Sequence, residues 1–356
     1  MSKIKISVYA ISKNEEKFVQ RFCESAKEAD EILILDTGST DNTVSIARQS
    51  GAKVHECLIS PWRFDIARNT ALSLVDKNID VCISLDLDEV LEPGWRQEIE
   101  QLWKDGVNRI SYKFYWGHGK EFYSTKIHSR KGFRWHHPVH EYIVPDRVSE
   151  KYASTNKRLV THYPDATKSR GQYLDLLELA VREDPRCPRN AFYYARELTY
   201  YSKWDEAIIA LEKYLGLPEA LWKEERCYAM RLLGKSYLYK ADSKAEGWFI
   251  KACAEAPQTR EPWVDLSDYY LKFDKFKDTL YYAEKALTIT NRQFNYVEDP
   301  SAWGYKPYDL IAVSSWFLGD REKAILNGKK AIELNSSDER LRNNLYFFTL
   351  NNNKAN

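Results

Sequence analysis

Three acidic residues, Asp86, Asp88 and Glu89, follow a short apolar stretch at residues 80–85. The stretch is partly β-branched, which predicts a buried strand. Because strand residues alternate between faces, Asp86 and Asp88 would point the same way if the extended geometry continued to them. Two such carboxylates repel each other, and a divalent cation such as Mg²⁺ or Mn²⁺, which also binds phosphate oxygens, would relieve the repulsion. The alternative is an acidic turn that only ends the strand.

The elements that must position these acids alternate between strand and helix. Strands are predicted at residues 4–9, 31–36, 51–56 and 80–85, and helices at 17–29, 43–50 and 64–75. This alternation predicts parallel β-α-β units, in which ligands bind beyond the carboxyl ends of the strands. Polar clusters at residues 12–15, 36–39 and 86–88 all fall at such ends. We therefore expect one ligand site at one edge of a sheet.

Two common nucleotide-binding motifs are missing from the sequence. No G-x-G-x-x-G follows the first predicted strand, and no G-x-x-x-x-G-K-[ST] occurs anywhere. These absences argue against a dinucleotide-dependent dehydrogenase and against a P-loop enzyme.

Four segments, in this order, resemble the family 2 glycosyltransferases of the GT-A fold. They are residues 8–15 (VYAISKNE), 35–43 (LDTGSTDNT), 67–72 (ARNTAL) and 85–88 (LDLD). The resemblance covers roughly residues 1–165. It implies a Rossmann-like α/β catalytic domain with a mixed sheet at 1–165. Its implied activity is that of a hexosyltransferase-type enzyme, which moves a sugar from a nucleotide-sugar donor, by default a UDP-sugar, to an acceptor hydroxyl with inversion.

The resemblance also implies roles for individual residues. Its donor-binding set places Ala10, Ile11 and Glu15 around the base, Asp36 at the base or ribose, Arg68 and Asn69 near the diphosphate or donor sugar, and Asp86 at the ribose or sugar. Two members have plainer alternatives. Asp36 could be a turn former, and Arg68 could be a surface arginine paired with Asp65.

The same resemblance implies a metal ion and a general base. Asp88 would hold Mn²⁺ or Mg²⁺, and a histidine near the end of the catalytic domain would complete the metal shell. His162, at the end of a predicted strand, is the first choice and His140 the second. Glu141 fits the base by position, because a carboxylate can accept the acceptor's hydroxyl proton. Only one acid stands where the family commonly has a pair, so acceptor binding by Glu141 is the alternative.

The second half of the sequence is helical and repetitive. First helices of repeated pairs are predicted to begin near Asn190, Glu224, Glu261 and Lys306. The first interval is close to the period of about 34 residues of tetratricopeptide repeats (TPR). We expect an all-α, TPR-like domain at residues 166–356. Its concave surface would bind the acceptor or mediate homo-oligomer formation, unless the domain only buttresses the catalytic one.

The overall composition limits the classes of partner that the protein is expected to bind. Formal net charge is +1, with 53 basic and 52 acidic residues, which disfavours long nucleic acid. Glycan, protein or peptide, and modified nucleic acid all stay open as acceptors. Six cysteines without a C-x-x-C pair, no signal peptide and no transmembrane segment favour a cytoplasmic protein. The rival hypothesis is a TPR scaffold whose front domain binds nucleotide without catalysis, or binds nothing.

Overall fold

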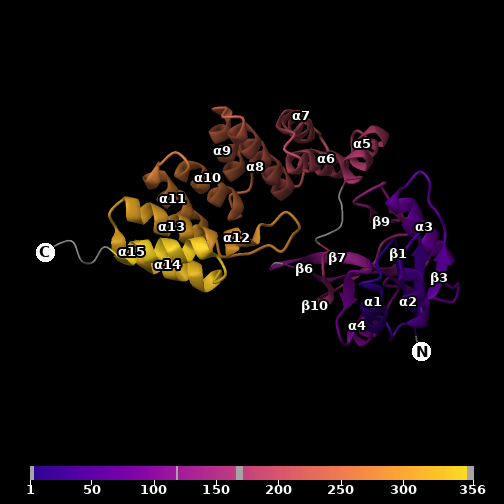
Figure 1. The fold of residues 1–356 in the computed structure, drawn as a ribbon. Coiled ribbons are helices and arrows are strands. Elements are labelled where there is room, and N and C mark those ends of the chain that lie inside the picture. Colours follow the sequence, from indigo (N-terminus) through magenta and orange to yellow (C-terminus); the bar gives the residue numbers. More distant parts are fainter. Residues whose placement is uncertain (1–3, 118, 166–170, 351–356) are drawn as a thin grey trace. The chain divides into compact units, whose positions relative to one another are not determined.

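The structure, a computed structural model, describes residues 4–117, 119–165 and 171–350 (Figure 1). Contacts divide the chain into two compact units, Met1–Glu183 and Asp184–Asn356. Helix α5 (Tyr173–Glu183) therefore packs with the first unit, although it lies beyond residue 165. The functional boundary expected at that residue stays a prediction.

A mixed sheet forms the centre of the first unit and has eight strands within the described residues, in the order β3-β2-β1-β4-β7-β6-β10-β5. The strands are β1 (Ile6–Ser12), β2 (Glu31–Asp36), β3 (Lys53–Glu56), β4 (Val81–Ser84), β5 (Glu89–Leu91), β6 (Arg109–Gly117), β7 (Lys120–Ser129) and β10 (Tyr152–His162). Strands β3, β2, β1 and β4 pair in parallel, β7 runs antiparallel to β4 and β6, and β10 is parallel to β6. The carboxyl ends of β1, β2, β4 and β10 therefore share one edge.

Helices cover the sheet because each presents one apolar stripe. The helices of this part are α1 (Val19–Ser25), α2 (Thr43–Gln49), α3 (Phe64–Leu74) and α4 (Trp95–Leu102), and a separate hairpin pairs β8 (Phe133–His136) with β9 (Tyr142–Pro145). On α3, Ala67 and Ala71 are fully buried at helical spacing. On α4, Trp95 is 1% exposed and belongs to the core under the sheet. Burying a side chain of this kind contributes roughly 1.5–3 kcal/mol.

The described part of the second unit consists of helices and their connections. Its helices are α6 (Pro188–Tyr200), α7 (Trp204–Leu215), α8 (Lys223–Tyr239), α9 (Lys244–Glu255), α10 (Glu261–Leu271), α11 (Phe276–Leu287), α12 (Pro300–Trp303), α13 (Lys306–Phe317), α14 (Arg321–Leu334) and α15 (Glu339–Leu350). Helices α6, α8, α10 and α13 start at or within two residues of the predicted positions, which confirms the helical-repeat prediction. At Gly234 a Cβ would lie 2.8 Å from the Phe249 ring, so a small residue is needed where α8 meets α9.

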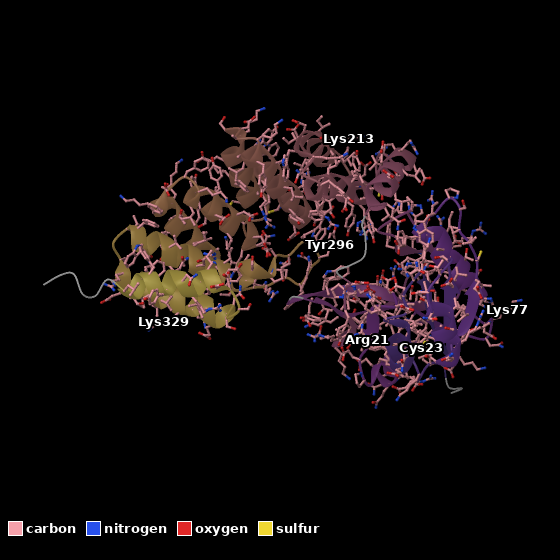
Figure 2. All side chains as sticks on the ribbon, in the orientation of Figure 1. Arg21, Cys23, Lys77, Lys213, Tyr296 and Lys329 are labelled. Carbon is pink, nitrogen blue, oxygen red and sulfur yellow. The ribbon has the colours of Figure 1, made fainter. Side chains whose placement is uncertain are left out.

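A long connection at residues 288–299 separates α11 from α12 and lengthens the last repeat interval. Its Tyr296, labelled in Figure 2, stacks on Tyr193 with ring centroids 5.8 Å apart. The Tyr296 hydroxyl also donates a hydrogen bond to the buried carboxylate of Glu225. These contacts fix the connection against α6 and α8. No helix in the described part of the chain is long and apolar enough to cross a membrane.

Candidate active site

The turn after β4 sets the positions of the acidic cluster. Strand β4 ends at Ser84, and the Glu89 amide then donates to the Asp86 carbonyl at 2.9 Å, which closes a turn. The extended geometry therefore does not reach the two aspartates. The Asp86 side chain is 42% exposed, whereas that of Asp88 is 9% exposed. The two carboxylates consequently meet different partners.

Asp88 lies beside His162. Asp88 Oδ2 and His162 Nε2 are 3.4 Å apart, and both side chains are 9% exposed. Pairing of β10 with β5 produces this approach, since His162 is in register with Glu89 and the Tyr163 amide donates to the Asp88 carbonyl at 2.8 Å. Burial lowers the pKa of His162, but the hydrogen bond and charge of Asp88 outweigh it and raise that pKa above its ordinary value.

The second metal candidate, His140, has a different neighbour. Its ring packs against Tyr173 of α5, with centroids 5.8 Å apart. Among the described residues, no three His, Cys, Asp or Glu side chains converge as a metal-binding group. The structure thus brings together two of the predicted metal residues, Asp88 and His162, and sets His140 against α5.

Arg68 of α3 connects the acidic turn to the β8–β9 hairpin. It is 3% exposed, and it donates from Nη2 to Asp86 Oδ1 and from Nε to Glu141 Oε1, both at 2.5 Å. Its guanidinium also lies 4.9 Å from the ring centroid of Trp135. Burial lowers the pKa of Arg68, but the charges of Asp86 and Glu141 raise it further, so the side chain stays cationic.

The alternative that Arg68 pairs with Asp65 at the surface is wrong. Asp65 is instead held by Arg63, which donates to both of its carboxylate oxygens at 3.0 Å. Arg68 faces the sheet because positions 64, 67, 68 and 71 lie on one side of a helix.

Glu141 lies in the segment between β8 and β9. The start of α3 fixes this segment, since the Phe64 amide donates to the Pro138 carbonyl at 3.0 Å. The Glu141 side chain is 10% exposed, and its Oε1 is bound by Arg68. No described residue donates a hydrogen bond to Oε2 of Glu141. One oxygen of this carboxylate is therefore anchored by Arg68, and the other accepts no hydrogen bond from a described residue.

Asn69, the neighbour of Arg68, holds the backbone of β8. Its amide nitrogen donates to the Trp135 carbonyl at 2.9 Å, and its amide oxygen accepts from the Trp135 amide at 2.8 Å. The side chain thus joins α3 to the hairpin that carries Glu141. Its predicted role at the diphosphate stays a prediction.

Asp36 ends β2 and organises the loop after it. It is 2% exposed and accepts hydrogen bonds from the Ser12 hydroxyl at 2.8 Å and from the Gly38 and Ser39 amides at 3.0 and 2.8 Å. Gly38 has φ 104°, and a Cβ there would lie 2.7 Å from Leu58. The turn-forming alternative is therefore confirmed, and contact with a base or ribose stays a prediction.

The three remaining donor-site candidates lie at the end of β1 and in the loop that follows. Ala10 is fully buried, Ile11 is half-buried, and the Glu15 amide donates to the Thr43 hydroxyl at 2.7 Å. They occupy the same edge as Asp36, because β1 and β2 are parallel neighbours.

Sequence reasoning missed Lys126 of β7. Its Nζ lies 2.9 Å from Glu89 Oε1 and 3.7 Å from Asp86 Oδ2. Burial lowers the pKa of Lys126, but the charges of Glu89 and Asp86 raise it, which keeps the ammonium charged. The sequence did contain one indication of such a residue. Three acids within four residues require nearby cations when they are partly buried.

Comparison with known proteins finds a family model that matches most of the first unit. Residues 7–165 match the model for glycosyl transferase family 2. An uncharacterized glycosyltransferase of Rickettsia bellii is 37% identical over 99 residues, which is 28% of this chain and 32% of the relative. The lipopolysaccharide core biosynthesis glycosyltransferase LpsC of Rhizobium meliloti is 28% identical over 162 residues, covering 40% of this chain and 58% of that protein. The chain thus spans about a third of the Rickettsia relative's length.

Solved structures resemble the helical part. A thermophilic TPR protein of Thermus thermophilus superimposes with a TM-score of 0.37 and 16% identity, over 50% of this chain and 91% of that one. Together with the mixed sheet and the order of the motifs, the family match shows that residues 7–165 form a family 2 glycosyltransferase domain of GT-A type, followed by a TPR-like helical region.

Proposed function

We propose that the first unit is a metal-dependent, inverting glycosyltransferase. Its donor is a nucleotide sugar, with a UDP-sugar as the first choice, and its acceptor is a hydroxyl group. The observation that supports this most is the grouping of Asp88 with His162 and of Arg68 with Asp86 and Glu141 around the turn after β4.

The side chains that would bind the metal suit Mn²⁺ or Mg²⁺. One carboxylate and one imidazole, 3.4 Å apart, supply two ligands from Asp88 and His162, and diphosphate oxygens would supply others. When bound, the cation would offset the negative charge that grows on the leaving diphosphate. His140 is the less favoured ligand, since its ring contacts α5.

Glu141 is the proposed general base. As the acceptor oxygen bonds to the anomeric carbon, the bond from that carbon to the diphosphate oxygen breaks, and the hydroxyl proton passes to Glu141 Oε2. Arg68 orients this carboxylate through Oε1 and remains cationic throughout. The alternative is that Glu141 binds the acceptor without taking its proton.

The roles proposed at the donor's remaining parts follow from the resemblance to family 2 glycosyltransferases. Ala10, Ile11 and Glu15 would frame the base and Asp36 would meet the base or ribose. Asp86 is the natural contact for the ribose or sugar, because it is the most exposed acid of the cluster. Asn69 would act near the diphosphate, through the backbone that it holds. The acceptor, a cytoplasmic location and self-association through the helical unit stay predictions.

Calorimetry with UDP and GDP, each with and without Mn²⁺, tests the proposal. We expect UDP to bind with measurable heat only when Mn²⁺ is present, because two protein ligands hold the cation weakly until the diphosphate completes its shell. His162→Ala should weaken the Mn²⁺-dependent binding, whereas His55→Ala, on β3, should not. Absence of heat with every nucleotide would favour the scaffold hypothesis.

A further inference from the structure

Lys126 contacts the acidic turn at two points. Its Nζ lies 2.9 and 3.3 Å from the two carboxylate oxygens of Glu89, and 3.7 Å from Asp86 Oδ2. Glu89, which is 1% exposed, accepts the Asp86 amide on Oε2 at 3.1 Å. Lys126 is therefore linked to Asp86 twice, once directly to the carboxylate and once through Glu89 to the backbone.

These contacts extend the ion pairs of Arg68 into a chain of alternating charge. The order is Glu141, Arg68, Asp86, Lys126 and Glu89. Asp86 is the central member and the most exposed, at 42% of its side chain, while the others range from 2% to 25%. Arg68 approaches its Oδ1 and Lys126 its Oδ2, so cations from two different elements flank its carboxylate.

We infer that Lys126 is a positioning residue for donor binding. It fixes the orientation in which Asp86 meets the ribose of the donor, and it does so without touching the donor itself. The inference rests on the proposed function. The alternative is that Lys126 only neutralises the charge of the buried Glu89. In that case Asp86 would bind the donor equally well without Lys126.

The double variant K126M/E89Q separates these roles. It removes both members of the buried pair together, which leaves no uncompensated charge. Glutamine can still accept the Asp86 amide, so the turn keeps its hydrogen bond. Asp86, in contrast, loses the cation at Oδ2. The matched single variant, Lys126→Met, leaves Glu89 buried without its cation and should unfold at a lower temperature than wild type.

The experiment measures the thermal unfolding midpoint and the affinity for UDP with Mn²⁺ in all three proteins. We expect K126M/E89Q to regain the wild-type midpoint and yet bind UDP about tenfold more weakly. A double variant that regains both midpoint and affinity would overturn the inference and leave the proposed function intact. A wild-type protein that binds no nucleotide would overturn both.

A double-mutant cycle provides a second test. It leaves Glu89 unchanged and so does not depend on the stability of K126M/E89Q. Lys126→Arg and Asp86→Asn are measured singly and together for UDP affinity with Mn²⁺. If Lys126 acts through Asp86, the combined loss is smaller than the product of the single losses. Losses that multiply would contradict the inference.

Discussion

Replacing Asp88 by asparagine is expected to reduce nucleotide-sugar turnover by about a thousandfold. The amide keeps the size of the side chain and its contact with His162, but it lacks the charge that holds a divalent cation. Losing about 4 kcal/mol of transition-state stabilisation, within the range a metal ion supplies, corresponds to this factor. The measurement is the initial rate of donor hydrolysis at saturating Mn²⁺, with the unfolding midpoint as a check on the fold.

Asp105→Asn is the matched control for this substitution. Asp105 is exposed and precedes β6, so it lies at the opposite edge of the sheet from Asp88. Its variant should hydrolyse donor at the wild-type rate. Undiminished turnover in Asp88→Asn would remove this residue from the metal site and would leave the acidic turn with a purely structural role.

Glu141→Gln should lower kcat by about 10² to 10⁴, the usual contribution of a general base. Affinity for UDP with Mn²⁺ should change little, because the glutamine oxygen can still accept from Arg68 Nε. Rates of transfer to water report the effect even while the acceptor is unknown, since water must also lose a proton as it attacks. Glu28→Gln, at an exposed position, serves as the control.

The two roles considered for Glu141 give different results in this variant. A base is needed whatever the acceptor is, so hydrolysis and transfer should fall together. If Glu141 only binds the acceptor, hydrolysis would continue at the wild-type rate and transfer alone would be lost. The second pattern would contradict its assignment as the base.

Much of the fold could be predicted from local patterns. The apolar strands ending at Asp36 and near Asp86 have the length and flanking turn chemistry of buried parallel strands, and β2 and β4 lie where they were expected. The repeat helices could be predicted equally well, because each starts after a turn and has apolar residues at helical spacing. The prediction that His162 ends a strand also agrees with β10.

The site could be predicted only in part from the sequence, because contacts across the sheet depend on the order of the strands. Lys126 meets Asp86 only because β7 inserts antiparallel between β4 and β6, and periodicity carries no information about that insertion. The same holds for Asn69, whose side-chain amide donates a hydrogen bond to the carbonyl of Trp135, 66 residues away along the chain. The divergence of Asp86 and Asp88 depends on one turn hydrogen bond, which a strand pattern does not encode.

Above all, we propose that the carboxyl edge of the sheet binds a nucleotide sugar through a divalent cation at Asp88 and His162. The most direct measurement is hydrolysis of a panel of nucleotide sugars, including UDP- and GDP-sugars, with Mn²⁺ and with a chelator. We predict that at least one UDP-sugar is hydrolysed and that the chelator abolishes the activity. Hydrolysis that is equally fast in the chelator would contradict the metal site, and no hydrolysis of any sugar nucleotide would contradict the enzyme.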